Sequence, residues 1–172
     1  MDTNTRRENI LNDLEISEIA IKGSKLAQKY KVSRQVIVQD IAILRARGIE
    51  IYATPQGYQI EKPRENVIRG RIVSKHETLE ELEDELTTII DLGGGILDVI
   101  VEHPIYGEIK APLMLFSRRD IAEFIKKITN LEAEPLSKLT EGVHIHTIEA
   151  RSEEILEEIK EALYDKEYLL KL

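Results

Sequence analysis

The sequence contains no cysteine and no tryptophan in 172 residues, and it contains no long apolar run. Without cysteine, disulfides, cysteine-ligated zinc, iron–sulfur clusters and thiol catalysis are excluded. A membrane-spanning helix needs about 18 consecutive apolar residues, and no segment approaches that length. The polar N-terminus lacks the apolar core of a secretory signal. We therefore expect a soluble, cytoplasmic protein without a membrane partner.

Charge is distributed unevenly along the chain. The net charge is −8, but residues 1–70 hold 12 Lys and Arg against 9 Asp and Glu, whereas residues 71–172 hold 12 against 23. This asymmetry predicts two parts with different partners. An acidic chain can still bind DNA because phosphates respond to the local field. The basic excess of the first part alone supports DNA binding only weakly.

The first 60 residues predict three short helices followed by a β-hairpin. Apolar spacing places the helices at about residues 6–14, 25–30 and 33–48. Ser24 and Ser33 are the expected caps, and Gly48 is the expected left-handed stop. The apolar period then changes to two around a Pro- and Gly-containing turn at residues 54–57, which is typical of a hairpin. This order is the layout of a winged helix-turn-helix.

The third helix has a surface that suits the major groove of DNA. Opposite its apolar face runs a stripe of two amides and two methyl groups, formed by Gln35, Gln39, Ala42 and Ala46. Small side chains allow close approach, and Gln can bond bidentately to adenine. Ser33 and Arg34 stand at the N-terminal end, where recognition helices contact bases and phosphates.

Basic residues around this helix are expected to contact phosphates, which sets the register without reading sequence. They are Arg45, Arg47, Lys29 and Lys31. The alternative is an ordinary three-helix cluster with solvated amides. The predicted wing that follows favours DNA binding.

The remainder of the chain predicts an α+β domain with helices against one antiparallel or mixed sheet. Strands are expected at residues 67–73, 96–101, 109–115 and 143–148, and helices at residues 79–90, 117–128 and 153–163. Gly93–Gly95 follows a helix and precedes a strand, the reverse of a phosphate-binding loop, so we interpret it as a turn. A short polar linker near residue 62 divides the chain into residues 1–62 and 63–172.

The four histidines all lie beyond residue 75. His144 and His146 are two apart in a predicted strand, so both rings leave the same face and can converge on one zinc, nickel, iron or copper ion. His76 lies where the first strand of the domain ends. In the following helix, Glu83 and Glu85 stand at the margins of the apolar stripe, where either can turn inward. Unrelated surface or core histidines are the alternative interpretation.

A tight turn between two predicted strands, residues 103–107, brings together a ring nitrogen, an aromatic face and a hydroxyl. We expect His103 and Tyr106 there to bind a planar heteroaromatic acid. A simple hairpin connection is the alternative. Candidates for the partner of the acid's carboxylate are Arg69, Arg71 and Lys110.

Several of these segments together resemble a known family. Ser33–Ile41, Arg45–Ala46 and Ala53–Tyr58 look like the helix-turn-helix of the niacin-responsive repressors, and Val101–Glu108 and Gly142–Glu149 resemble their "3H" domain, named for its histidines. The resemblance covers almost the whole chain. It implies a winged helix-turn-helix followed by a small α/β, HPr-like domain. It also implies a cytoplasmic, dimeric repressor of NAD biosynthesis or niacin transport genes, with nicotinic acid as co-repressor.

The resemblance also implies one divalent transition metal per chain, held by three histidines and one glutamate. Carried over to this sequence, these ligands are His76, Glu85, His144 and His146. Asp84 and Glu81 remain alternatives for the carboxylate, although helical spacing favours Glu85. Nickel, zinc and iron all suit this ligand set, because affinity order and availability decide which ion is bound.

Three hypotheses follow. The leading one is a repressor without enzymatic activity, in which niacin and metal change how two winged helices are spaced on a palindromic, double-stranded operator. The second is a metal-dependent hydrolase fused to a DNA-binding domain, with three histidines holding the ion and Glu85 as general base; a ligand carboxylate could not also be that base. The third is a repressor that responds to metal alone, without an organic effector.

Overall fold

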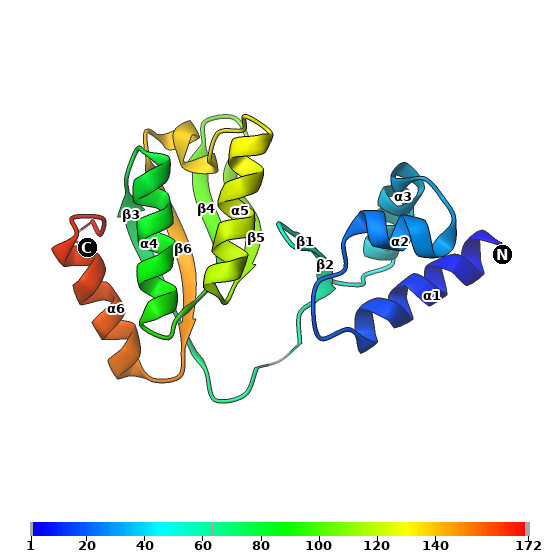
Figure 1. Cartoon of the computed structure of the whole chain (residues 1–172), viewed down its shortest axis with the longest axis horizontal. Helices are drawn as coiled ribbons and strands as arrows, with labels where there is room; N and C mark the ends of the chain where they lie inside the picture. The colour runs from blue at the N-terminus through cyan, green and yellow to red at the C-terminus, as the bar shows by residue number, and fades with distance from the viewer. Residues whose placement is uncertain (1, 63, 171–172) are drawn as a thin grey trace. The chain divides into compact units, whose positions relative to one another are not determined.

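The computed structural model describes residues 2–62 and 64–170, which form two compact units that divide between residues 63 and 64 (Figure 1). A helical unit precedes a unit built on a sheet, so the α+β prediction is confirmed. None of the helices in the described part of the chain has the length and apolar character that crossing a bilayer requires.

The first unit contains three helices and a two-stranded hairpin. They are α1 (Thr3–Ile16), α2 (Gly23–Tyr30), α3 (Arg34–Ala46), β1 (Ile51–Thr54) and β2 (Gly57–Ile60). Its core is aliphatic and includes Ile10, Leu26 and Ile41. The hairpin is tied back to the helices by a bridge between Ile21 and Tyr58. Gly57 makes this approach possible, since a Cβ there would lie 2.5 Å from the carbonyl oxygen of Ile21.

Two predicted caps of the first unit have different outcomes. Ser33 caps α3 as expected, because its Oγ accepts a hydrogen bond from the amide of Val36. The prediction for Ser24 is wrong: α2 starts at Gly23, its N-cap position is Lys22, and no side chain caps it. Ser24 is therefore the second residue of the helix, two positions past the N-cap, from which a side chain would accept a hydrogen bond from a free helix amide.

Within the first unit, Asp40 of α3 is buried, which its place in a DNA-reading helix did not suggest. Its carboxylate accepts hydrogen bonds from Nε of Arg6 at 2.7 Å and from Nε of Arg7 at 2.9 Å. Buried charges need such partners. These ion pairs tie the start of α1 to the middle of α3 and so fix the angle between the two helices.

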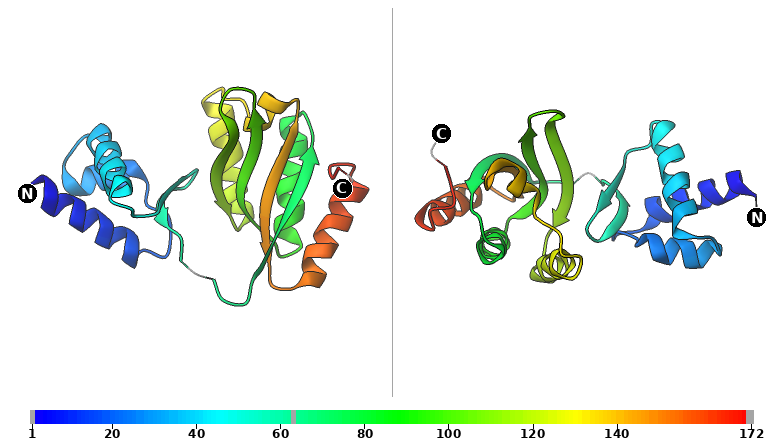
Figure 2. Two further views of the ribbon diagram at one scale, coloured as in Figure 1. Left: turned by 180° about the vertical axis from the view of Figure 1, so that it is seen from behind. Right: turned by 90° about the horizontal axis from the view of Figure 1, so that it is seen from above.

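The second unit is a four-stranded antiparallel sheet with strand order β3-β6-β4-β5. Its strands are β3 (Ile68–Lys75), β4 (Gly95–His103), β5 (Gly107–Leu115) and β6 (Val143–Ala150). Its helices are α4 (Leu79–Asp91), α5 (Arg118–Asn130), α6 (Glu153–Asp165) and the 3-10 helix η1 (Leu136–Thr140). Helices α4 and α5 cover one face of the sheet (Figure 1), and the view from behind shows the opposite face without a helix (Figure 2).

The C-terminal segment of this unit was not predicted. After α6 the chain returns to the edge strand β3, where the amide of Lys75 donates to the carbonyl of Tyr168 and the amide of Leu170 donates to that of Val73. The segment places the Tyr168 ring 5.9 Å from the ring of His76. It therefore covers the end of β3 at which this histidine lies.

Candidate metal centre

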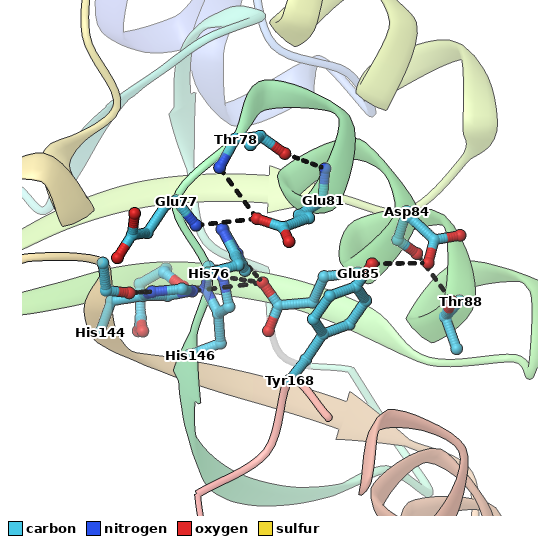
Figure 3. Close-up of polar contacts among 12 residues, drawn as sticks. His76, Glu77, Thr78, Glu81, Asp84, Glu85, Thr88, His144, His146 and Tyr168 are labelled. Carbon is cyan, nitrogen blue, oxygen red and sulfur yellow. Dashed lines mark hydrogen bonds and ion pairs between the residues drawn. The ribbon is translucent and has the colours of Figure 1, made fainter. Parts of the chain in front are cut away.

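Three histidines and one glutamate meet on the helix-covered face of the sheet. His76 follows β3, Glu85 comes from α4, and His144 and His146 come from β6 (Figure 3). The period of two along β6 turns both of its histidine rings toward α4. The exposed fractions of the four residues, in chain order, are 5%, 0%, 2% and 1%. We refer to these four side chains as the His–Glu cluster.

One carboxylate oxygen lies at the middle of the His–Glu cluster. Glu85 Oε2 is 2.7 Å from Nε2 of His76, 3.2 Å from Nε2 of His144 and 3.6 Å from Nε2 of His146. The ligand atoms of the first two histidines and of Glu85 all lie within 4.8 Å of one another. The fold thus brings Glu85 to His144, 59 positions later in the sequence, and presents three nitrogens and a carboxylate to one point.

Main-chain carbonyls determine which nitrogen of each strand histidine carries the proton. Nδ1 of His144 lies 2.8 Å from the carbonyl oxygen of Gly142, and Nδ1 of His146 lies 2.7 Å from that of Asp98. A carbonyl oxygen only accepts, so Nδ1 is the donor in both rings. In the neutral imidazole, Nε2 then keeps its lone pair and faces the cluster, which is the arrangement that metal-binding histidines use.

The residues present fit a divalent cation. Among the described residues, Glu85 Oε1 and His146 Nε2 are buried without a hydrogen-bond partner. A buried polar group without a partner costs roughly 1–3 kcal/mol, and the two groups are neighbours, since His146 Nε2 lies 3.6 Å from the other oxygen of the same carboxylate. An ion there would serve both atoms, and imidazole with carboxylate suits zinc, nickel and iron.

The charge of Glu85 is stabilised by the three rings. Burial by itself raises the pKa of this carboxyl, but the charge of His146 and the hydrogen bonds with His144 and His76 outweigh it, so the pKa lies well below its usual value. For His144, burial lowers the pKa, and the hydrogen bond and charge of Glu85 raise it further than burial lowers it. The cluster therefore requires a compensating positive charge, either a proton or a metal ion.

The two alternative carboxylates are used elsewhere. Glu81 forms a capping box with Thr78 at the start of α4. Asp84 accepts hydrogen bonds from Lys166 and from the hydroxyl of Tyr168. Burial and that hydrogen bond to Asp84 raise the pKa of Tyr168 to about 12. Only Glu85 among the three points into the His–Glu cluster (Figure 3).

The predicted effector residues lie apart from the cluster, at the turn between β4 and β5. Nδ1 of His103 accepts hydrogen bonds from the amides of Ile105 and Tyr106. The two predicted residues have ring centroids 5.0 Å apart, and Tyr106 is 77% exposed. The turn offers an open aromatic face rather than an enclosed pocket.

The predicted DNA-contacting side chains gather on α3 and its cap. Ser33, Arg34, Gln35 and Gln39 are all exposed. Arg45 is exposed as well, but its Nε donates a hydrogen bond to the carbonyl oxygen of Ile51 at 2.7 Å. This bond joins the end of α3 to the first strand of the wing.

Two residues that support the cluster were missed in the sequence. The carbonyls of Gly142 and Asp98 hold the strand histidines, and the carbonyl of Gly142 also accepts from the amide of His76. The glycine immediately before the histidine-containing strand was the available signal. No spacing rule points to residue 98, because its contact with the cluster is made by its main chain.

Comparison with known proteins relates both units to characterised families. A 3H domain matches residues 69–172, and a helix-turn-helix domain matches residues 6–59. The chain is 42% identical over 165 residues to the probable transcription repressor NiaR of Thermotoga maritima, covering 96% of this chain and 93% of that protein. It is 39% identical over 168 residues to the transcription repressor NadR of Bacillus subtilis, with the same two coverages.

Proposed function

The chain belongs to the niacin-responsive family of repressors with a helix-turn-helix and a 3H domain, and we propose that it represses transcription under the joint control of a divalent metal ion and nicotinic acid. Its first unit binds DNA. In our proposal the second unit senses the effector, the regulated genes serve NAD biosynthesis or niacin uptake, and the protein acts as a homodimer in the cytoplasm.

The His–Glu cluster is the observation that carries the proposal. His76, Glu85, His144 and His146 would hold one nickel, zinc or iron ion per chain, since two of their buried atoms otherwise lack partners. A bound ion supplies a positive charge that a carboxylate or a pyridine nitrogen can approach. The chain's own residues enclose the site, orient the ring nitrogens and neutralise part of that charge through Glu85.

His103 and Tyr106 remain the predicted contacts of the pyridine ring of nicotinic acid. The exposed face of Tyr106 allows offset stacking with a planar ring. If the pair binds the effector, Tyr106→Ala raises the nicotinic acid concentration needed for half-saturation and leaves metal affinity unchanged. An unchanged nicotinic acid titration assigns the effector to other residues.

For the DNA-binding unit, we propose that α3 enters the major groove. Gln35 and Gln39 would read base edges, while Ser33, Arg34 and Arg45 would contact the ends of the bound segment and its phosphates. A single small module buries a limited interface on DNA. Two copies on a palindromic operator double that contact. The distance between their two recognition helices must then match the distance between the half-sites, and the effector can change that match.

A thermal-shift titration separates this function from its alternatives. The proposal predicts that metal raises the unfolding temperature, and that nicotinic acid raises it further only when metal is bound. A response to metal with none to nicotinic acid would favour a repressor that senses metal alone.

A hydrolytic role has little support. Glu85 is fully buried and hydrogen-bonded to histidine nitrogens, so it is not free to activate a water molecule as a general base. The two relatives are named as transcription repressors. Turnover of candidate amides or esters by metal-loaded protein would be the result that revives an enzymatic role.

A further inference from the structure

Asp98 occupies an irregular position in the sheet. The pairing register of β4 shifts between Ile96 and Asp98 against both neighbouring strands, β5 and β6. A β-bulge of this kind often re-aims a group next to a functional site. Asp98 is only 3% exposed, which is unusual for a carboxylate.

The side chain and the main-chain carbonyl of Asp98 each accept a hydrogen bond from one of two neighbouring residues of β6. Its side-chain Oδ1 accepts a hydrogen bond from the amide of Thr147 at 3.0 Å. Its main-chain oxygen accepts one from Nδ1 of His146 at 2.7 Å. Paired residues of a regular antiparallel ladder satisfy such amides with main-chain carbonyls. Here the side chain accepts from the strand amide, and the carbonyl is directed at the imidazole.

A lysine holds the carboxylate from the opposite side. Nζ of Lys110 on β5 lies 2.9 Å from Asp98 Oδ2, and the side chain of this lysine is 50% exposed. Asp98 is thus fixed at three points, by Lys110, by the Thr147 amide and by the His146 ring. Asp98 pairs with Thr147, and the next residue, Val99, pairs with His146. Because successive strand residues alternate between faces, the Asp98 carboxylate lies on the face of the sheet opposite the His–Glu cluster, whereas its carbonyl reaches a ring of that cluster.

We propose that Asp98 is a positioning residue of the metal centre, which acts through His146. By accepting the Thr147 amide with its side chain, Asp98 keeps its carbonyl on Nδ1 of the histidine. That hydrogen bond selects the Nδ1–H tautomer and aims the unprotonated Nε2 at Glu85. The inference rests on the proposed metal site, but the tautomer it predicts exists before any metal binds.

The proposal depends on the hydrogen-bond acceptor of the Asp98 side chain and not on the negative charge of that side chain. Asp98→Asn keeps an oxygen for the Thr147 amide, so it should preserve the metal centre. Asp98→Ala removes that oxygen and leaves the amide to compete for the carbonyl. Thr147→Val is the matched control: it lies beside both residues, its hydroxyl lacks a hydrogen-bond partner among the described residues, and its amide is unchanged.

Long-range proton–nitrogen NMR of the His146 ring, together with zinc titration of the same samples, tests the proposal. In metal-free protein at mildly alkaline pH, the unmodified chain, Asp98→Asn and Thr147→Val should show the Nδ1–H tautomer. Asp98→Ala should show a mixture with Nε2–H. Its zinc affinity should fall by about 10- to 100-fold, the usual loss when an outer-shell partner of a metal ligand is removed.

An Nε2–H tautomer in the unmodified chain would overturn the proposal, even if Asp98→Ala does not fold. The same holds if Asp98→Ala keeps both the tautomer and the zinc affinity of the unmodified chain, or if Thr147→Val loses as much affinity as Asp98→Ala. If the unmodified chain binds no metal but Asp98→Ala still changes the His146 tautomer, the positioning role of Asp98 holds and the proposed metal-dependent function is wrong.

Discussion

Glu85 is the residue on which the His–Glu cluster depends most directly. It is fully buried, and its Oε2 contacts the nitrogens of three histidines. An uncompensated carboxylate in such a place would be costly, so a proton or a cation must accompany it. Replacing one carboxylate oxygen of Glu85 by an amide nitrogen therefore tests metal binding with little change in the shape of the folded protein.

Replacing Glu85 by Gln keeps the shape of the side chain and removes its negative charge. We expect the affinity for zinc or nickel to fall by at least about 100-fold, because outer-shell changes alone cost 10- to 100-fold. Isothermal titration measures the loss. Glu83→Gln, an exposed neighbour on the same helix, is the control and should bind metal normally; equal affinity of both variants would remove Glu85 from the ligand set.

The raised pKa of His144 predicts how metal affinity depends on pH. The ion needs the neutral imidazole, so a proton competes with it. Because this pKa lies above its ordinary value of 6.5, competition extends above that pH. Affinity should rise with pH through this range and then level. Titrations in two buffers of different ionisation enthalpy, near about pH 6.5 and about pH 8.5, should show more protons released at the lower pH; equal release at both would contradict the prediction.

At the scale of an element, the turn before β6 sets where the histidine strand begins. Gly142 has a φ of +88°, and a Cβ on it would lie 2.3 Å from the carbonyl oxygen of His76. Its own carbonyl accepts from the amide of His76 and from the ring of His144. The close approach of two backbones therefore brings the edge-strand histidine to the pair on β6.

Gly142→Ala should damage the metal centre through this backbone contact. The left-handed conformation costs an alanine about 1–2 kcal/mol, and the clash must in addition displace residue 76. We expect metal affinity to fall by about 10-fold or more. Gly107→Ala is the control, since its φ is +70° with no atom within 4 Å of the added Cβ. Gly107→Ala should lower the unfolding free energy and leave the metal affinity unchanged. Equal metal affinities of Gly142→Ala and Gly107→Ala would refute the role of Gly142.

Helix α3 carries a prediction about DNA reading. Gln39→Ala should lower the preference for operator over random DNA by about 1–3 kcal/mol, the value of a good base contact, and leave the salt dependence of binding unchanged. Arg47→Ala should weaken binding to all sequences alike and reduce the salt slope by about 1. Fluorescence anisotropy at several salt concentrations distinguishes the two patterns, and identical behaviour of both variants would contradict them.

Elements with a strong period could be predicted from the sequence, and tertiary pairings could not. The alternation around His144 and His146 correctly predicted that both rings lie on one face. The apolar stripe of α4 left Glu83 and Glu85 as alternatives, and in the structure Glu83 is exposed and Glu85 is buried. The same wheel on α3 did not reveal that Asp40 is buried, because its partners Arg6 and Arg7 lie more than 30 residues away.

Contacts made by main-chain atoms were equally hidden from the sequence. The bulge at Asp98 has no side-chain period, and the return of Tyr168 to β3 depends on amides and carbonyls that every residue carries. The resemblance to the 3H family named the four cluster residues together. The structure adds the distances, the ring tautomers and the two atoms without partners.

At the scale of the whole molecule, the chain joins a DNA-binding unit to a second unit that carries the His–Glu cluster. A ligand changes operator affinity only if it binds two arrangements of the protein with different affinity. Removing the metal with a chelator should therefore weaken operator binding and abolish its response to nicotinic acid. Adding back zinc or nickel should restore both. A response to nicotinic acid that survives chelation would contradict joint control by the metal ion and nicotinic acid.

The most direct test measures operator affinity against nicotinic acid concentration, at fixed salt, with DNA that the protein itself selects from a random pool. For metal-loaded protein, we predict that nicotinic acid tightens binding by about 5- to 150-fold, the usual range of coupling between two sites. Glu85→Gln should bind the same DNA weakly at every nicotinic acid concentration. Operator affinity that stays constant across the titration of the metal-loaded protein would contradict the account.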